Sequence, residues 1–274
     1  MLASVTADGV ELLDKETIET IGGKDYYVIS ISKAPKNAYE TSDIYLFYKD
    51  GETLKKMYRI KHSLLNYAAS LLRRDESKYT GKTLEYLVDS KEMMQYVLNY
   101  AKEAIERYGD LEGEALTEAL APIDALLSEF ALSEEDLTLE NVKTELPTAT
   151  GTAAAFDLNT KVGFTLGVYN TFTGTVSIRI GDREASGEFT AYDAAEAEIA
   201  GTVAIDNILA YQLYSKDIEI TVVGTNAGVE VNESFTYNLA TYVNSGVSGD
   251  VGAALYAYAK QADAYRKHTV GTIE

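Results

Sequence analysis

Two stretches of this sequence are nearly identical: LNYAKEA at Leu98–Ala104 and YAYAKQA at Tyr256–Ala262. When Tyr100 is aligned with Tyr258, the same helical face is apolar in both stretches. A repeated amphipathic helix predicts a repeated supersecondary unit, because such a helix cannot bury its apolar face alone. The repeat therefore constrains the fold more strongly than any other feature of the chain.

The similarity extends upstream of both helices. SLLNYAASLL at 63–72 aligns with NLATYVNSGV at 238–247, and both begin with a residue type favoured as a helix N-cap. Further upstream, DIYLFY from Asp43 aligns with DIEITV from Asp217, and YYVISI at 26–31 aligns with TVAI at 202–205. The order of strands, short helix and longer helix thus occurs twice. The alternative is a chance match of two amphipathic helices.

The two copies are unequal in length. The first has extra residues between its helices, around RRDESKYTGKTLEYLVDS, and it has no counterpart of about 153–176, the opening strands of the second. One explanation is that the sequence begins inside a repeat. The other is that the first copy is a genuine half-domain that borrows strands from elsewhere.

The segment from about Ala155 to Val223 is rich in strands and turns. Its candidate strands are KVGFTLGVYN, GTVSIRIGD, GEFTAYD, AEIAGTVAID and KDIEITVVG, separated by turns that carry Gly or Asp. Because no helical pattern separates the strands, this spacing favours a β-sandwich over a β-α-β fold. In the first half we expect a strand in YYVISIS, and helices at 64–72 and about 90–108, with Ser63 as the N-cap of the former.

These patterns predict an α+β fold with two tandem modules. Each module is a β-sandwich-like antiparallel sheet followed by a pair of helices, and the first is truncated at its N-terminus. The predicted domains are a partial first module at 1–108, an acidic, partly helical linker at 109–150, and a second module at 151–274. Within the linker, a helix at 114–132 is interrupted or begun at Pro122.

The paired motifs resemble poorly characterised repeat modules of large secreted or wall-attached proteins of Gram-positive anaerobic bacteria. In those modules a β-sandwich precedes a Tyr-Ala helix and a helix of the form L-x-x-A-x-x-x-Y-A-x-x-A. The matching residues are Leu64, Asn66, Tyr67, Ala68, Leu98, Asn99, Tyr100, Ala101 and Ala104, and Leu239, Tyr242, Leu255, Tyr258, Ala259 and Ala262 in the second copy. The resemblance carries no catalytic signature. It implies an extracellular or cell-wall-attached, non-catalytic context, with a signal peptide upstream of this sequence.

Charge and composition exclude several classes of partner. The chain has 24 basic and 43 acidic residues, a net charge of −19, so nucleic acid and anionic membrane surfaces are not expected to bind it. It contains no cysteine, which excludes disulfides, zinc thiolate sites and thiol catalysis. No apolar run is long enough to span a membrane, so no membrane insertion is expected.

No constellation of residues predicts catalysis, and we expect no catalytic residue, metal or cofactor. The two histidines are His62, expected to face solvent or a helix cap beside Ser63, and His268, expected in a frayed tail. The acidic stretch at 131–141 lacks the glycine and spacing of an EF-hand, so calcium is the minority reading there. No glycine loop has the spacing that cradles phosphate. A hydrolase using two carboxylates stays open as a third function.

Tyrosines are the remaining candidates for binding, since the chain has 21 of them and no tryptophan. Tyr169, Phe172 and Tyr192 lie at or near predicted loops and are the candidate ligand-binding platform for a sugar; the alternative is that they pack in the core or at a sheet edge. The helical tyrosines, Tyr67, Tyr100, Tyr242 and Tyr258, are expected in a core seam between helices and sheet, with each hydroxyl reaching a polar partner.

The function these features favour is a non-catalytic structural spacer or adhesion module of a bacterial surface protein, with a polysaccharide or another surface protein as the candidate partner. The alternative is a carbohydrate-binding module of a polysaccharide-degrading complex.

Overall fold

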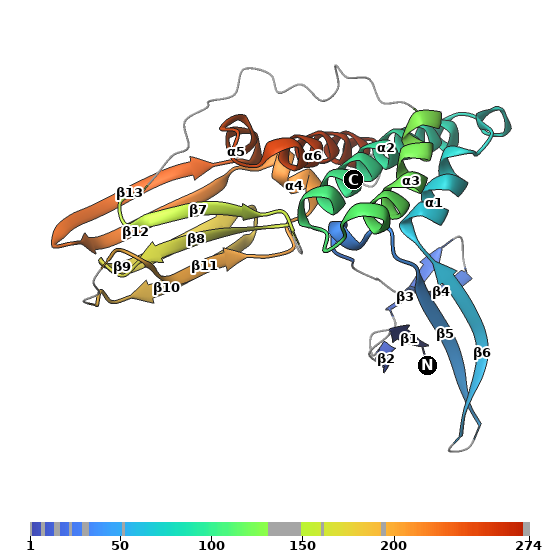
Figure 1. The fold of residues 1–274 in the computed structure, drawn as a ribbon, viewed down its shortest axis with the longest axis horizontal. Coiled ribbons are helices and arrows are strands. Elements are labelled where there is room, and N and C mark those ends of the chain that lie inside the picture. Colours follow the sequence, from blue (N-terminus) through green and yellow to red (C-terminus); the bar gives the residue numbers. More distant parts are fainter. Residues whose placement is uncertain are drawn as a thin grey trace.

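The computed structural model describes residues 2–6, 9–13, 17–21, 24–28, 33–50, 53–130, 149–159, 162–192 and 196–270. Over these residues the chain is mixed α+β, with antiparallel sheets and six α-helices (Figure 1). The predicted α+β class is confirmed.

The second half of the chain contains two antiparallel sheets. Their strands are β7 (Thr152–Asp157), β8 (Gly163–Tyr169), β9 (Phe172–Ile180), β10 (Arg183–Phe189), β11 (Ile199–Ile205), β12 (Ile218–Asn226) and β13 (Val229–Tyr237). One sheet has the order β10-β9-β12-β13 and the other β11-β8-β7. Along β9, buried and exposed positions alternate, as expected for a strand with one face on the core. Residues of both sheets belong to a single apolar cluster.

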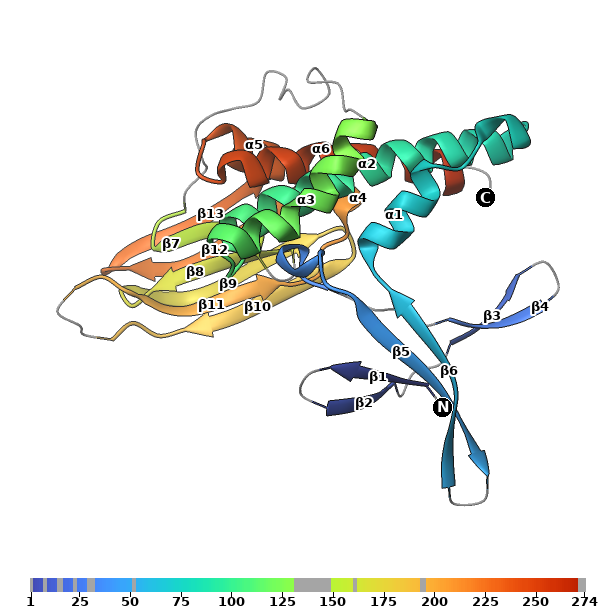
Figure 2. The same ribbon diagram turned by 45° about the vertical axis from the view of Figure 1, so that its right-hand side comes forward.

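The first half contains a four-stranded sheet and a separate hairpin. The sheet has the order β2-β1-β5-β6, and the hairpin consists of β3 and β4. The strands are β1 (Leu2–Thr6), β2 (Gly9–Leu13), β3 (Thr17–Ile21), β4 (Lys24–Val28), β5 (Ser42–Asp50) and β6 (Thr53–His62). The β5–β6 hairpin projects away from the helices and from β7–β13 (Figure 2).

Helices follow the strands in both halves. They are α1 (Leu64–Leu72), α2 (Lys82–Tyr108), α3 (Gly113–Glu129), α4 (Ala210–Ser215), α5 (Leu239–Asn244) and α6 (Gly249–Val270), with short 3₁₀ turns η1 (Pro35–Asn37) and η2 (Glu76–Lys78). The Ser63 hydroxyl accepts a hydrogen bond from the Asn66 amide and caps α1, and the Asn238 side chain caps α5 in the same way. Both predicted caps are confirmed.

Helix α3 lies inside the predicted acidic linker. It packs against α1 and α2, and Leu120, Ile123 and Leu126 are buried in a cluster with residues of those helices. The helix runs through Pro122, so the predicted interruption there is wrong. The predicted linker is therefore partly helical, and its helix buries an apolar face.

Helices α2 and α6 pack on each other, far apart as they are in the sequence (Figure 1). The Gln261 amide donates to the Glu92 carboxylate at 3.0 Å, and the Tyr100 and Tyr258 rings stack with their centroids 6.2 Å apart. Arg107 lies beside Gly249. Because the beginning of α2 meets the end of α6 and vice versa, the two helices are antiparallel.

Candidate functional site

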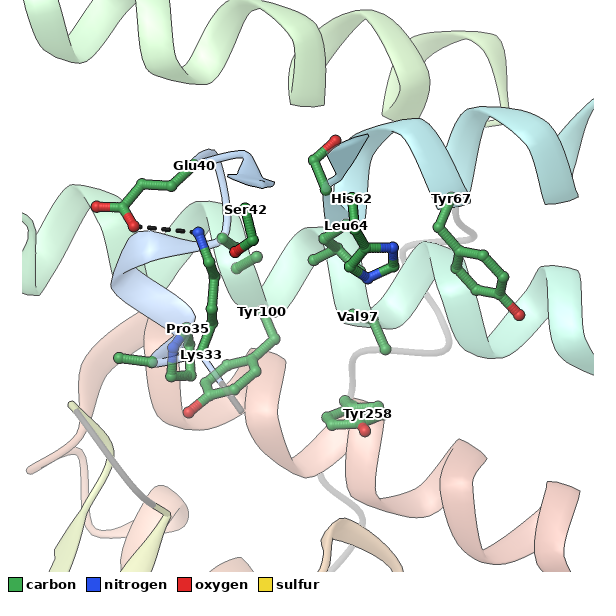
Figure 3. Close-up of a pocket in the computed structure, with 14 residues that line it drawn as sticks. Lys33, Pro35, Glu40, Ser42, His62, Leu64, Tyr67, Val97, Tyr100 and Tyr258 are labelled. Carbon is green, nitrogen blue, oxygen red and sulfur yellow. Dashed lines mark hydrogen bonds and ion pairs between the residues drawn. The ribbon is translucent and has the colours of Figure 1, made fainter. Parts of the chain in front are cut away.

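A cavity of about 300 Å³ lies where η1, the base of the β5–β6 hairpin, α1, α2 and α6 meet (Figure 3). That volume is at the low end of the range for small-molecule sites. The lining is largely apolar, and the residues come from η1, β5, β6, α1, α2 and α6 and from the residues beside η1 and α1. The lining residues are Lys33, Ala34, Pro35, Ala38, Glu40, Ser42, His62, Ser63, Leu64, Tyr67, Val97, Tyr100, Ala101 and Tyr258.

The local sequence determines the residue at which α1 begins beside this cavity. The Ser63 cap begins the helix directly after β6, so His62 is the last residue of the strand, and Leu64 and Tyr67 belong to the first turn of the helix. Pro35 begins the 3₁₀ turn η1, where its fixed φ suits a helical start. Two of the segments that border the cavity, the start of α1 and the turn η1, are thus specified by their local sequence.

The polar groups of the cavity lie at its edge. The Lys33 ammonium and the Glu40 carboxylate form an ion pair at 3.1 Å, and both side chains are partly exposed. Such a pair contributes little to stability. The Ser63 hydroxyl is occupied as the helix cap, and the neighbouring His62 side chain is exposed, in agreement with the prediction for these two residues.

The four helical tyrosines occupy different environments. The Tyr100 ring is buried, and its hydroxyl donates to the Leu158 carbonyl at 3.2 Å, as predicted. Burial raises the pKa of Tyr100 and of Tyr258 above the ordinary value for tyrosine. Tyr242 is also buried. For Tyr67 the prediction of a core position is wrong, because its side chain is 49% exposed at the edge of the cavity.

The predicted sugar platform is only partly at the surface. Phe172 is 0% exposed and belongs to the apolar cluster of the second half, where no ligand reaches its ring. Tyr192 is 49% exposed, and its hydroxyl donates to the Glu198 carboxylate at 2.9 Å, which raises the pKa of Tyr192. Tyr169 is half-buried at the end of β8. The Tyr192 amide donates to the Asn170 carbonyl, so the two tyrosines lie in one group of loops.

His268 is not in a frayed tail, and that prediction is wrong. The residue lies in the last turns of α6, and its Nδ1 is 2.6 Å from Oδ2 of Asp89 on α2. The hydrogen bond to Asp89 raises the pKa of His268, and the nearby carboxylate of Glu85 contributes in the same direction. This contact closes one end of the α2–α6 pair.

The His268–Asp89 contact predicts a small dependence of stability on pH. Because the folded state raises the pKa of His268, its contribution is fully present below the unfolded value of 6.5 and is lost as the pH rises through the folded value. We expect NMR titration of His268 to give a pKa above 6.5, and His268→Gln to remove this part of the pH dependence of unfolding. A His268 pKa below 6.5 would contradict the contact.

The cavity could not be found from the sequence, because its walls converge from elements that are far apart in the chain.

Among the residues that the structure describes, no group of three or more histidine and acidic side chains is placed to hold a metal ion. The acidic stretch at 131–141 lies outside the described residues. Within the described part of the chain, no helix is both long and apolar enough to cross a membrane.

No protein-family profile, curated protein or solved structure matches this chain.

Proposed function

We propose that the chain is a tandem pair of one structural module, which serves as a rigid spacer or adhesion unit of an extracellular multi-modular protein. The observation that carries the proposal is the stack of Tyr100 on Tyr258. These are the residues that align in the sequence repeat. In a two-fold arrangement of like units, the residue on the axis contacts its own counterpart.

Contacts beside the tyrosine stack support the same two-fold relation. In the alignment Glu92 corresponds to Asp250, and Glu103 corresponds to Gln261. Glu92 accepts a hydrogen bond from Gln261. Burial raises the pKa of Glu103, and the nearby carboxylates of Glu106 and Asp250 raise it further. Each contact is the counterpart of the other when the two copies are exchanged.

The topology of the two halves supports the repeat as well. The orders β2-β1-β5-β6 and β10-β9-β12-β13 are each two hairpins side by side, with the second hairpin leading into a capped short helix and then a long one. A short helical turn precedes that second hairpin in each half, and η1 packs on α2 as α4 packs on α6. On this proposal, the two sheets of the second half form the predicted sandwich.

A spacer must hold a fixed length, and the described contacts favour this. Tyr100 of α2 is a member of the apolar cluster that β7–β13 build, so one half contributes a core residue to the other. A buried tyrosine with a satisfied hydroxyl leaves little freedom between the two halves. The acidic surface favours solubility at high local concentration, as on a cell wall.

Rigidity is measurable with spin labels, because the chain contains no native cysteine. Ser70 on α1 and Thr175 on β9 are exposed and accept a Cys substitution without loss of core packing. Double electron–electron resonance between labels at these positions is expected to give one narrow distance distribution. Tyr100→Ala combined with Tyr258→Ala should broaden it. A broad distance distribution in the spin-labelled chain that keeps both tyrosines would overturn the spacer function.

A carbohydrate-binding module is the second candidate, favoured by the exposed ring of Tyr192 close to Tyr169. The test is retention of the chain on insoluble starch, cellulose, xylan and mucin, beside a Tyr169→Ala/Tyr192→Ala variant. Retention that the variant loses would move the function to carbohydrate binding. Absence of retention on all four would leave the spacer or adhesion function, in which the partner is another surface protein.

A further inference from the structure

The second half shows what covers the aromatic residues at the base of a hairpin. Phe156 of β7 packs on Tyr242 and Tyr237 with ring centroids 5.3 and 5.7 Å apart. Phe164 of β8 packs on Tyr237 at 5.3 Å and on Phe156 at 5.2 Å. Strands β7 and β8 therefore place two phenylalanines against Tyr237 at the end of β13, and Phe156 also packs on Tyr242 of the following helix α5.

In the first half, the positions aligned with Tyr237 and Tyr242 are His62 and Tyr67. Both line the cavity of about 300 Å³. Tyr67 is 49% exposed, whereas Tyr242 is 8% exposed. The described part of the first half contains no counterpart of β7 and β8, so the space that Phe156 and Phe164 fill in the second half is the open cavity in the first.

Tyr100 on α2 and Tyr258 on α6 also lie in different surroundings in the two halves. Tyr100 reaches into the second half, where its hydroxyl donates to the carbonyl of Leu158, the residue directly after β7. Its counterpart Tyr258 reaches into the cavity of the first half (Figure 3). No residue that the structure describes accepts a hydrogen bond from the Tyr258 hydroxyl. A strand in the place of β7 would supply the acceptor, as Leu158 does for Tyr100.

The backbone offers a matching edge. In the second half β11 pairs with β8. The aligned strand of the first half is β4, which among the described strands pairs only with β3. A strand with one unpaired edge can take up an added strand, with main-chain hydrogen bonds for affinity and side-chain pockets for specificity.

We propose that this cavity is the docking site for an antiparallel strand pair with the chemistry of β7 and β8, supplied by a neighbouring copy of the module. The pair inserts an aromatic side chain against Tyr67 and offers a main-chain carbonyl to Tyr258. The inference rests on the tandem repeat of the proposed function. It adds to that function a specific means by which modules join.

The first test uses the full chain and a fluorescent peptide of residues 150–170 as the probe. We expect saturable binding by fluorescence anisotropy. A peptide with Phe156→Ser and Phe164→Ser is expected to bind at least tenfold more weakly, because it cannot bury the two aromatic side chains in the cavity. In the chain, Tyr258→Phe should weaken binding about fivefold through loss of one hydrogen bond.

Blocking the cavity distinguishes this site from exchange with β7 and β8 of the second half. Val97→Phe adds a ring inside the cavity, and we expect it to abolish binding while the thermal midpoint of the chain shows that the variant is folded. Equal binding of both peptides, or unchanged binding to the folded Val97→Phe chain, would overturn the proposal.

A covalent version avoids dependence on the solubility of the peptide. Residues 149–171 joined directly before Met1 place the strand pair in the order that it has in the second half. We expect slower hydrogen exchange in α1 and at Tyr67, and a higher thermal midpoint than in the same extension with both phenylalanines changed to serine. No difference between the two extensions would reject the docking site, whereas the spin-label distances test the rigid-spacer function independently.

Discussion

Tyr100→Ala is expected to lower the free energy of unfolding by about 3–5 kcal/mol, as truncation of a large buried aromatic does. The Tyr100 ring is 4% exposed, lies in the core of the second half and stacks on Tyr258. Its removal leaves a cavity at the α2–α6 contact and leaves the Leu158 carbonyl without its donor. Urea unfolding monitored by circular dichroism measures the loss.

Two variants separate the causes of this loss. Tyr100→Phe keeps the ring and removes the hydroxyl, and should cost about 1 kcal/mol. Tyr67→Ala removes the same side chain from the partly exposed position on α1, and should cost much less than Tyr100→Ala, because little apolar area leaves the core. If Tyr67→Ala destabilised the chain as much as Tyr100→Ala, the contrast between the two environments would be wrong.

Phe156→Ala is the second substitution with a large expected effect, again about 3–5 kcal/mol. The Phe156 ring contacts Phe164, Tyr237 and Tyr242, so its loss removes contacts to the paired strand β8, to β13 of the other sheet and to α5. The variant makes the second half similar to the first, with an open space above Tyr242. We expect the exchange of α5 amides to accelerate in hydrogen-exchange mass spectrometry.

Val229→Ala is the matched control for Phe156→Ala. This residue lies on the neighbouring strand β13 and is 67% exposed, so its truncation should change the free energy of unfolding by less than about 0.5 kcal/mol. A Phe156→Ala variant as stable as Val229→Ala would show that the aromatic group is not part of the core.

Local patterns predicted much of the fold correctly. Helix α1 and its Ser63 cap follow from one apolar face and one hydroxyl, and both are observed at the predicted residues. Strand β13 was missed, because VEVNESFTY is polar on the exposed face and carries no strong β signal at its centre. Helix α2 begins at Lys82, earlier than predicted, and Leu87 in its early turns is buried in the cluster with residues of α1 and α3.

The candidate site could not be predicted from local sequence patterns. Tyr242 packs on Phe156, a residue distant in the chain, whereas Tyr67 is 49% exposed, and no sequence window around either tyrosine contains that information. Phe172 was predicted at or near a loop, because it lies between the candidate strands KVGFTLGVYN and GTVSIRIGD. The ring instead enters the core, since β9 begins at this residue and its inward positions start there.

Helix α2 faces two cores: Leu98 and Ile105 pack with α1 and α3, whereas Tyr100 and Ala104 pack with the second half. This division has a consequence for synthesis on the ribosome. The face that carries Tyr100 is translated well before α6 and the strands that bury it, and at typical elongation rates the interval is on the order of ten seconds. During that time the nascent chain exposes an apolar helix face. A chaperone that shields this face during translation is therefore expected to raise the yield of folded protein.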